Sequence, residues 1–203
     1  MKKISVVFFK QTIMKKNLYL LGAVILLVAC ASFIPKKDKM ESKKKTIYDF
    51  RIQGLDGSTI DFSRFKGKKI LIVNTASKCG YTPQYAGLEK LYTTHKDNLV
   101  IVGFPSDNFG GQEFQDNKDI SSFCQKNYGV TFPLTTRVDV KGPNTTPIYK
   151  YLTEKSENGV LDATISWNFN KFYIDEHGNL VAHFDSNVKP DSPELLKYID
   201  AKR

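Results

Sequence analysis

The strongest constraint on the fold is the way short apolar runs and helical patterns alternate along the chain. The run Ile70–Val73 is apolar throughout, which is typical of a strand buried on both faces of a sheet. It enters a loop of small residues, and the segment 84–95 then places apolar side chains at helical spacing. A second apolar run at 99–104 ends in another loop. Strands that alternate with helices predict an α/β fold built on a mixed sheet.

Turn signals extend this pattern in both directions. Asp56 and Gly57 separate two short alternating stretches, which predicts a β-hairpin at the N-terminus of the folded part. Residues 171–184 alternate in the same way and predict a second hairpin. The remaining predicted elements are a strand at 133–140 and helices around Cys124, at 147–152 and at 193–201. We therefore expect a central mixed β-sheet flanked by helices, with an N-terminal β-hairpin.

The positive charge of the chain lies almost entirely before these elements. The 203 residues are enough for one domain, and their formal net charge is +9. Residues 1–45 hold 11 lysines and only two acidic residues, so residues 46–203 are formally neutral. A nucleic-acid-binding face needs positive charge clustered on the folded part. Nucleic acid is therefore not expected as a partner.

The N-terminal segment resembles an export signal. Residues 18–34 are apolar and follow Lys15 and Lys16. A short basic region before a compact apolar core is typical of a secretory signal, and the run is at the lower limit for a bilayer-spanning helix. The sequence LVAC at 27–30 also resembles the lipobox of bacterial lipoproteins, which implies cleavage before Cys30 and lipidation of Cys30. The alternative is an uncleaved anchor helix.

These features predict three parts. Residues 1–29 are predicted to be a lipoprotein-type signal peptide, with Met14 as a second candidate start because MetLysLys recurs there. Residues 30–47 are predicted to be a lysine-rich tether, since they hold too little apolar surface to fold. Residues 48–203 are predicted to form the folded domain. Either kind of anchor holds this domain at a membrane, and we expect it at the bacterial cell envelope, outside the cytoplasm.

The chain has three cysteines, Cys30, Cys79 and Cys124. If Cys30 carries lipid, one pair remains, and this pair fits either a static disulfide or two thiols that cycle. The sequence has no CxxC motif and no Cys/His cluster with metal-ligand spacing, so we expect no metal site and no cofactor.

Cys79 stands between a buried strand and a helix start. Unpaired backbone N–H groups and the helix dipole favour an anion there, which predicts a reactive thiolate. Thioredoxin folds share this arrangement, but position 82 is threonine here rather than a second cysteine. Without a partner one helical turn away, Cys79 is better suited to attack a peroxide O–O bond than to exchange disulfides.

Three stretches in order resemble the glutathione peroxidase family. NTASKCGYT at 74–82 is similar to the family's active-site signature, with cysteine where some members carry selenocysteine. FPSDNFGGQEF at 104–114 and WNFNKF at 167–172 agree in order and spacing. The resemblance covers residues 48–203 and implies a thioredoxin-like fold. It also implies a thiol peroxidase that reduces hydrogen peroxide and organic or lipid hydroperoxides in the response to oxidative stress.

The same resemblance implies a catalytic group of Cys79, Gln112, Trp167 and Asn168. Peroxide cleavage needs a nucleophilic thiolate and neutral donors that stabilise charge as the O–O bond lengthens. Two amides and an indole N–H supply such donors. Taken singly, Trp167 also fits a core aromatic residue, and Gln112 and Asn168 also fit ordinary loop polarity.

Cys124 has two interpretations. The segment SSFCQKNYGVTFP resembles the one that carries the resolving cysteine of non-selenium members, which use thioredoxin rather than glutathione. That resemblance implies that Cys124 attacks oxidised Cys79, and that a thioredoxin-like protein or glutathione reduces the resulting disulfide. The other interpretation is that Cys124 fills an apolar helix face beside Ile120 and Phe123.

Three further expectations concern partners and competing functions. The chain from 152 to 167 is short and lacks the insertion that resembles a subunit interface in tetrameric members, so we expect a monomer. The main alternative function is a membrane-tethered thiol redox sensor or relay, which needs the same reactive cysteine. A lipid-anchored binding module without chemistry is the third, and the intact set of site residues argues against it.

Overall fold

The computed structural model describes residues 45–201, so the predicted signal peptide, Cys30 and most of the predicted tether lie outside the described residues. In chain order the elements are η1 (Ile47–Asp49), β1 (Arg51–Gln53), β2 (Thr59–Asp61), η2 (Phe62–Phe65), β3 (Lys69–Thr75), α2 (Gln84–Thr94), β4 (Leu99–Pro105), α3 (Asn117–Tyr128), α4 (Pro147–Thr153), α5 (Lys155–Asn158), β5 (Lys171–Ile174), β6 (Leu180–Phe184) and α6 (Pro193–Ile199). Between residues 45 and 201 no helix is long and apolar enough to cross a bilayer.

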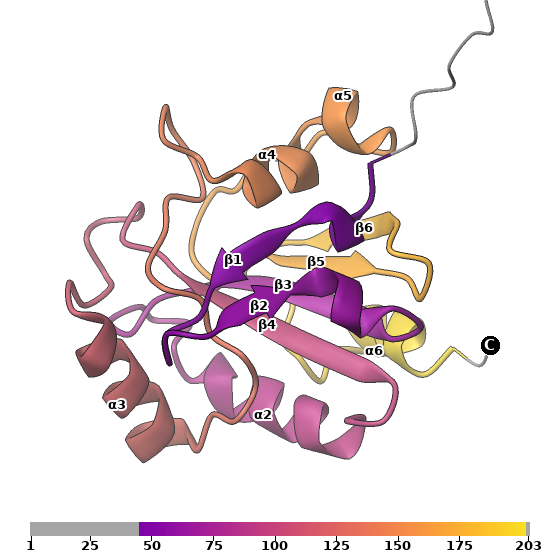
Figure 1. The fold of residues 1–203 in the computed structure, drawn as a ribbon. Coiled ribbons are helices and arrows are strands. Elements are labelled where there is room, and N and C mark those ends of the chain that lie inside the picture. Colours follow the sequence, from indigo (N-terminus) through magenta and orange to yellow (C-terminus); the bar gives the residue numbers. More distant parts are fainter. Residues whose placement is uncertain (1–44, 202–203) are drawn as a thin grey trace, which may run out of the picture. The chain divides into compact units, whose positions relative to one another are not determined.

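A four-stranded mixed sheet with the order β4-β3-β5-β6 forms the centre (Figure 1). β3 is parallel to β4 and antiparallel to β5, and β5 is antiparallel to β6. Every residue of β3 and β4 is buried, which explains their uninterrupted apolar sequences. Because side chains alternate across a strand, Ile70 and Ile72 join one core cluster while Leu71 and Val73 join the other.

Each face of the sheet is covered by its own layer. On the Ile70 face, η1, η2, the β1–β2 hairpin and α4 contribute Ile47, Phe62, Ile60 and Tyr149 to the core. On the opposite face, α2, α3 and α6 contribute apolar side chains to the second cluster. Figure 1 shows α4 and α2 on opposite sides of the strands. The predicted architecture, a mixed sheet flanked by helices with an N-terminal hairpin, is confirmed.

The predicted strand at 133–140 was wrong. This segment forms only two isolated bridges, from Leu134 to Gly103 of β4 and from Thr135 to Gly54 beside β1. Pro133 lacks the N–H that a ladder requires. The backbone also changes partner along the segment: Thr135 N donates to Gly103 O, whereas Thr136 N donates to Gln53 O. The segment therefore links the hairpin to the sheet without extending either.

The folded part begins before Tyr48, which is the residue at which the sequence analysis predicts its start. Ile47 is fully buried in the core, and its N–H donates to Gly178 O at 3.0 Å. The N–H of Thr46 donates to the Asp49 carboxylate at 2.9 Å and caps η1. The apolar side chain of Ile47 thus anchors the end of the predicted tether in the domain.

Three loops meet at one edge of the sheet because of the strand directions. The parallel strands β3 and β4 end together, since Thr75 pairs with Pro105. β5 is antiparallel, so it begins at this same edge, where Lys171 pairs with Val73. The loops that follow β3 and β4 and the loop that precedes β5 therefore converge. They carry the three stretches that resemble the glutathione peroxidase family.

Candidate active site

Cys79 lies in a run of tight turns between β3 and α2. Its N–H donates to Thr82 Oγ1 at 3.0 Å, and Thr82 Oγ1 donates to Ala76 O at 2.8 Å. The threonine that replaces the second thioredoxin cysteine therefore closes this loop. The prediction that Cys79 stands at the helix start is only approximately correct, because α2 begins at Gln84, five residues later. The sulfur of Cys79 accepts a hydrogen bond at 3.4 Å from the N–H of Tyr81, which lies in the turns before the helix. Cys79 is 7% exposed, so most of the residue is covered by its neighbours.

Gln112 and Asn168 are brought together from different loops. Asn168 Nδ2 donates to Gln112 Oε1 at 3.1 Å. The backbone carbonyl of Gln112 accepts from the N–H of Lys78, which precedes Cys79, at 2.9 Å. Asn168 is fully buried, and its Oδ1 has no partner among residues 45–201. The two amides thus share a position beside the Cys79 loop, with polar capacity left for a ligand.

Trp167 is on the surface rather than in the core. Its side chain is 39% exposed and packs against Phe109, with ring centroids 5.8 Å apart. Two residues later, Phe169 is fully buried although its φ is 65°, a conformation rare for a bulky residue. Such backbone strain is concentrated at functional sites. This turn buries Phe169 while its neighbour Trp167 stays at the surface, so the interpretation of Trp167 as a core aromatic residue is excluded.

A buried amide network holds the Trp167 loop in place. Asn74 at the end of β3 donates through Nδ2 to Trp167 O at 3.0 Å and accepts from Asn170 N at 2.9 Å. Asn170 Nδ2 donates to Trp167 O and to Ser186 Oγ, at 2.8 and 3.1 Å. The Asn170 Oδ1 is therefore an acceptor and receives the Nε2–H of His183 at 2.8 Å. Burial lowers the pKa of His183, which favours the neutral ring.

Lys171 connects the start of β5 to the start of α2. Its Nζ donates to Gln84 Oε1 at 2.6 Å and to the backbone carbonyls of Val188 and Ser186, at 2.5 and 3.4 Å. The side chain is fully buried, and burial lowers the pKa of Lys171 to about 7. This ammonium fixes the first residue of α2 against the strand that follows the Trp167 loop.

Cys124 and Cys79 are both free thiols and belong to the same buried cluster. Cys124 is 1% exposed on the inner face of α3. Burial raises the pKa of Cys124 to about 11, the nearby Tyr85 hydroxyl lowers it, and the Glu113 carboxylate raises it further. The pair does not form a static disulfide in this structure.

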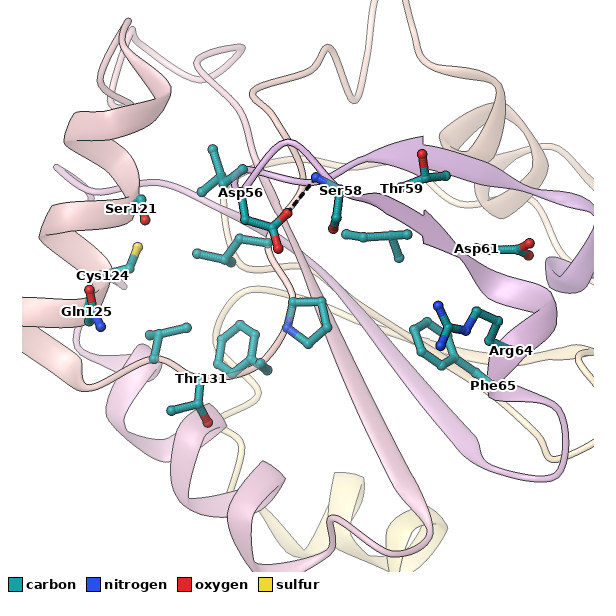
Figure 2. A pocket seen from close by; sticks show the side chains of 16 residues that line it. Asp56, Ser58, Thr59, Asp61, Arg64, Phe65, Ser121, Cys124, Gln125 and Thr131 are labelled. Carbon is teal, nitrogen blue, oxygen red and sulfur yellow. Dashed lines mark hydrogen bonds between the residues drawn. The ribbon is translucent and has the colours of Figure 1, made fainter.

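Cys124 also lies in the wall of a surface pocket. This pocket has a volume of about 580 Å³ and is formed by the β1–β2 hairpin, α3 and residues 130–134. Figure 2 shows the Cys124 side chain extending from α3 on one side of the pocket, with Arg64 on the other. Cys79, Gln112 and Trp167 do not line it. The pocket thus approaches the second thiol without including the predicted peroxide site.

Several residues of the site were missed in the sequence. Asn74, Glu113, Asn170 and Lys171 all lie inside the three stretches that resemble the family, yet nothing in their spacing shows that they are buried. The sequence did contain one signal for two of these residues. Asn74 and Lys171 stand directly beside the apolar parts of β3 and β5, at the strand ends where site residues are expected. Within residues 45–201 no group of three or more His, Cys, Asp and Glu side chains is placed to hold a metal ion.

Comparison with known proteins agrees with this geometry. The family model described as glutathione peroxidase matches residues 47–153. A glutathione peroxidase-like peroxiredoxin, GPX5 of Chlamydomonas reinhardtii, is 46% identical over 157 residues, which cover 76% of this chain and 96% of that protein. A hydroperoxy fatty acid reductase of Synechocystis sp. is 45% identical over 152 residues, 72% of this chain and 90% of that protein.

The fold comparison leads to the same family. A crystal structure of Trgpx in its apo form superposes with a TM-score of 0.59 at 31% identity, covering 77% of this chain and 97% of the other. The sheet is therefore thioredoxin-like. The stretch 74–82, which carries Cys79, lies at the carboxyl end of β3, and it falls within the residues that the family model matches. The chain belongs to the glutathione peroxidase family as a cysteine-type member, and it is a thiol peroxidase.

Proposed function

We propose that Cys79 is the residue that reacts with the peroxide. Its thiolate sulfur attacks one peroxide oxygen, the O–O bond breaks, and the other oxygen leaves as an alkoxide or hydroxide that takes a proton from water. Cys79 becomes a sulfenic acid. The amides of Gln112 and Asn168 and the indole N–H of Trp167 act as neutral donors that stabilise the charge on the leaving oxygen.

The observation that carries this proposal is the hydrogen bond between Asn168 and Gln112. It joins the loop before β5 to the loop after β4, while Gln112 O accepts from the residue next to Cys79. Residues far apart in sequence are thereby brought beside the loop that carries Cys79. The substrate class is supported by a relative that is named for its action on hydroperoxy fatty acids.

Cys124 is the proposed resolving residue. It shares a buried cluster with Cys79, and its pKa of about 11 keeps it almost wholly protonated near neutral pH. Peroxide therefore oxidises Cys79 first, and the Cys124 sulfur then displaces the sulfenic hydroxyl to form a disulfide. A thioredoxin-like dithiol, or glutathione, returns the disulfide to two thiols.

The location is a separate proposal that depends on the N-terminal sequence. Lipidation of Cys30 would hold the domain, as a monomer, at a membrane of the bacterial cell envelope, outside the cytoplasm and close to lipid hydroperoxides. Metabolic labelling with a fatty acid analogue tests this, since a Cys30→Ser variant should lose the label. Labelling that persists in this variant would exclude lipidation at Cys30.

The function is tested by peptide mass spectrometry after one equivalent of hydrogen peroxide is added to the reduced protein. The expected product is a disulfide between Cys79 and Cys124. Stable oxygen addition at Cys79 with Cys124 still free would exclude the two-thiol cycle and favour a one-cysteine enzyme or a sensor. Absence of any modification would exclude Cys79 as the reactive group.

A further inference from the structure

Four buried polar side chains near the two thiols have open hydrogen-bonding positions. These atoms, which are enclosed and make no well-formed hydrogen bond within residues 45–201, are Thr75 Oγ1, Ser77 Oγ, Tyr85 Oη and Glu113 Oε2. A buried polar group without a well-formed hydrogen bond lowers the stability of the folded state. Four of them in one region of a single domain are unusual and call for a functional explanation.

Glu113 is the acidic member of this group. The residue is 1% exposed, and its Oε1 accepts from the N–H groups of Ser77 and Phe114, at 3.1 and 2.9 Å. These two bonds fix the carboxylate and leave Oε2 open. Burial raises the pKa of Glu113, while the Ser77 hydroxyl, the two N–H groups and the ammonium of Lys78 lower it. The carboxylate is thus held next to the Cys79 loop in a position to take a proton.

Tyr85 connects this carboxylate to Cys124. Its ring is fully buried and packs edge-on against Phe169 and at a tilt against Tyr128, with centroids 5.4 and 5.5 Å apart. Its hydroxyl lies within hydrogen-bonding reach of Cys124 and Thr75, and burial, together with the charge of the Glu113 carboxylate, raises its pKa. Ser77, two residues after Thr75, contacts Glu113 in turn. A polar path therefore runs from Cys124 past Tyr85 to Glu113 through an otherwise apolar cluster.

We infer that Glu113, acting through the Tyr85 hydroxyl, accepts the proton of Cys124 when that thiol attacks oxidised Cys79. This inference rests on the resolving role proposed for Cys124. The Cys124 sulfur supplies the electron pair of the new S–S bond, and the S–O bond of the sulfenic acid breaks with its electron pair on oxygen. The departing hydroxide takes a proton from the path and leaves as water. One thiol and one sulfenic acid thus yield one disulfide and one water, and no other reactant is needed.

The inference predicts a distinctive pH dependence for disulfide formation. Glu113 must be ionised to accept a proton, so the rate should fall as pH drops through its pKa, which burial places above the usual value of about 4.3. The ionisable groups that face Glu113 are Lys78 from the loop before α2, Tyr85 from α2 and Cys124 from α3. In the variant Glu113→Gln the inflection caused by the Glu113 carboxylate should disappear from the pH profile. Direct ionisation of Cys124 should then control the rate, which should rise about tenfold per pH unit.

The experiment separates the two chemical steps in the full-length reduced protein by rapid mixing with hydrogen peroxide and acid quench. Peptide mass spectrometry then follows loss of the Cys79 thiol and appearance of the disulfide. In Glu113→Gln, oxidation of Cys79 should stay within a factor of about three, and disulfide formation near neutral pH should slow by roughly 100-fold. Tyr85→Phe keeps the ring and should slow the same step. The matched control is Tyr149→Phe, which removes a buried, unpartnered hydroxyl from the other core cluster and should change neither step.

The possible outcomes distinguish this inference from the proposed function. If the wild-type protein forms no disulfide between Cys79 and Cys124, the resolving role itself fails. If the wild type forms it and both variants keep its rate and its pH profile, the resolving role stands and the Glu113 path is wrong. Equal slowing of both steps would also overturn the path, because it would indicate a general structural defect. Should Glu113→Gln not fold, Tyr85→Phe decides by the same criteria.

Discussion

Asn74 Nδ2, at the carboxyl end of β3, donates a hydrogen bond to the backbone carbonyl of Trp167 at 3.0 Å. A side chain just before the Cys79 loop thereby fixes the loop that carries Trp167 and Asn168. The same Asn74 side chain accepts from Asn170 N at 2.9 Å. One buried amide therefore sets the distance between two parts of the site.

Replacing this amide should damage both stability and activity. Asn74→Ala leaves Asn170 N without its acceptor and removes one donor from Trp167 O, so the free energy of unfolding should fall by about 2–3 kcal/mol. Peroxidase activity of the folded protein should drop at least about tenfold, because the donors near Cys79 lose their position. Urea unfolding and steady-state kinetics measure the two effects. Asn127→Ala, at an exposed amide of α3, is the control, and an equal loss there would contradict the assignment.

Removal of the indole N–H should affect the first chemical step alone. Trp167→Phe should slow oxidation of Cys79 by hydrogen peroxide by roughly 100-fold, since one donor to the leaving oxygen is lost. The free energy of unfolding should change by less than about 0.5 kcal/mol, because the side chain is at the surface. Stopped-flow competition with a reference peroxidase measures the rate. The exposed Tyr81 provides the matched control, and a Tyr81→Phe variant as slow as Trp167→Phe would argue against a specific role for the indole.

Loss of the second thiol should uncouple the two halves of the cycle. Cys124→Ser should retain the wild-type rate of Cys79 oxidation, because the first step does not use Cys124. Turnover with a thioredoxin-like dithiol should fall at least about 100-fold, since no intramolecular disulfide can form. A coupled assay that follows the oxidation of the reductant measures turnover. Wild-type turnover in this variant would refute the two-thiol cycle.

The buried ammonium of Lys171 should make stability depend on pH. Burial lowers its pKa to about 7, whereas a lysine of the unfolded chain titrates near 10.4. Between these values the unfolded chain binds more protons than the folded one, so the contribution of Lys171 to the free energy of unfolding rises with pH. The free energy of unfolding of the wild type, relative to that of Lys171→Met, should rise by up to about 1.4 kcal/mol per pH unit above pH 7. Urea unfolding over this range tests the trend, with exposed Lys90→Met as the control, and a difference that stays constant with pH would contradict it.

The side chains packed against Gly103 should leave no room for a larger residue at this position. A Cβ at this position would lie 2.4 Å from Leu134 Cδ2 and 3.3 Å from the ring of Phe132. Gly103→Ala should therefore lower the free energy of unfolding by about 1–3 kcal/mol. In contrast, a Cβ at Gly80 meets nothing within 4 Å, so Gly80→Ala should be near neutral for stability. Thermal unfolding of both variants distinguishes this packing effect from a general cost of replacing glycine.

Most elements were predictable because their signals are local. The helix from Gln84 and the buried strands at 69–75 and 99–105 follow from periodicity and apolar runs. The prediction of a strand at 133–140 was wrong because the segment's hydrogen-bond partners lie far away in the sequence. Thr135 N donates to Gly103 O, whereas Thr136 N donates to Gln53 O, so the segment pairs with no single strand. Whether an extended segment joins a ladder depends on the strands beside it, which the segment's own sequence does not specify.

The sequence by itself determined the family and most of the order of the elements, and it predicted Cys79 as the reactive thiol, because these depend on residue types at fixed spacing along one chain. Only the tertiary structure decided that Trp167 is exposed while Phe169 is buried, and that Asn74 holds their loop. It also decided that Glu113 and Tyr85 are enclosed beside Cys124. Burial, and the pKa values that follow from it, arise where strand directions bring distant loops to one edge of a sheet. No local pattern contains that information.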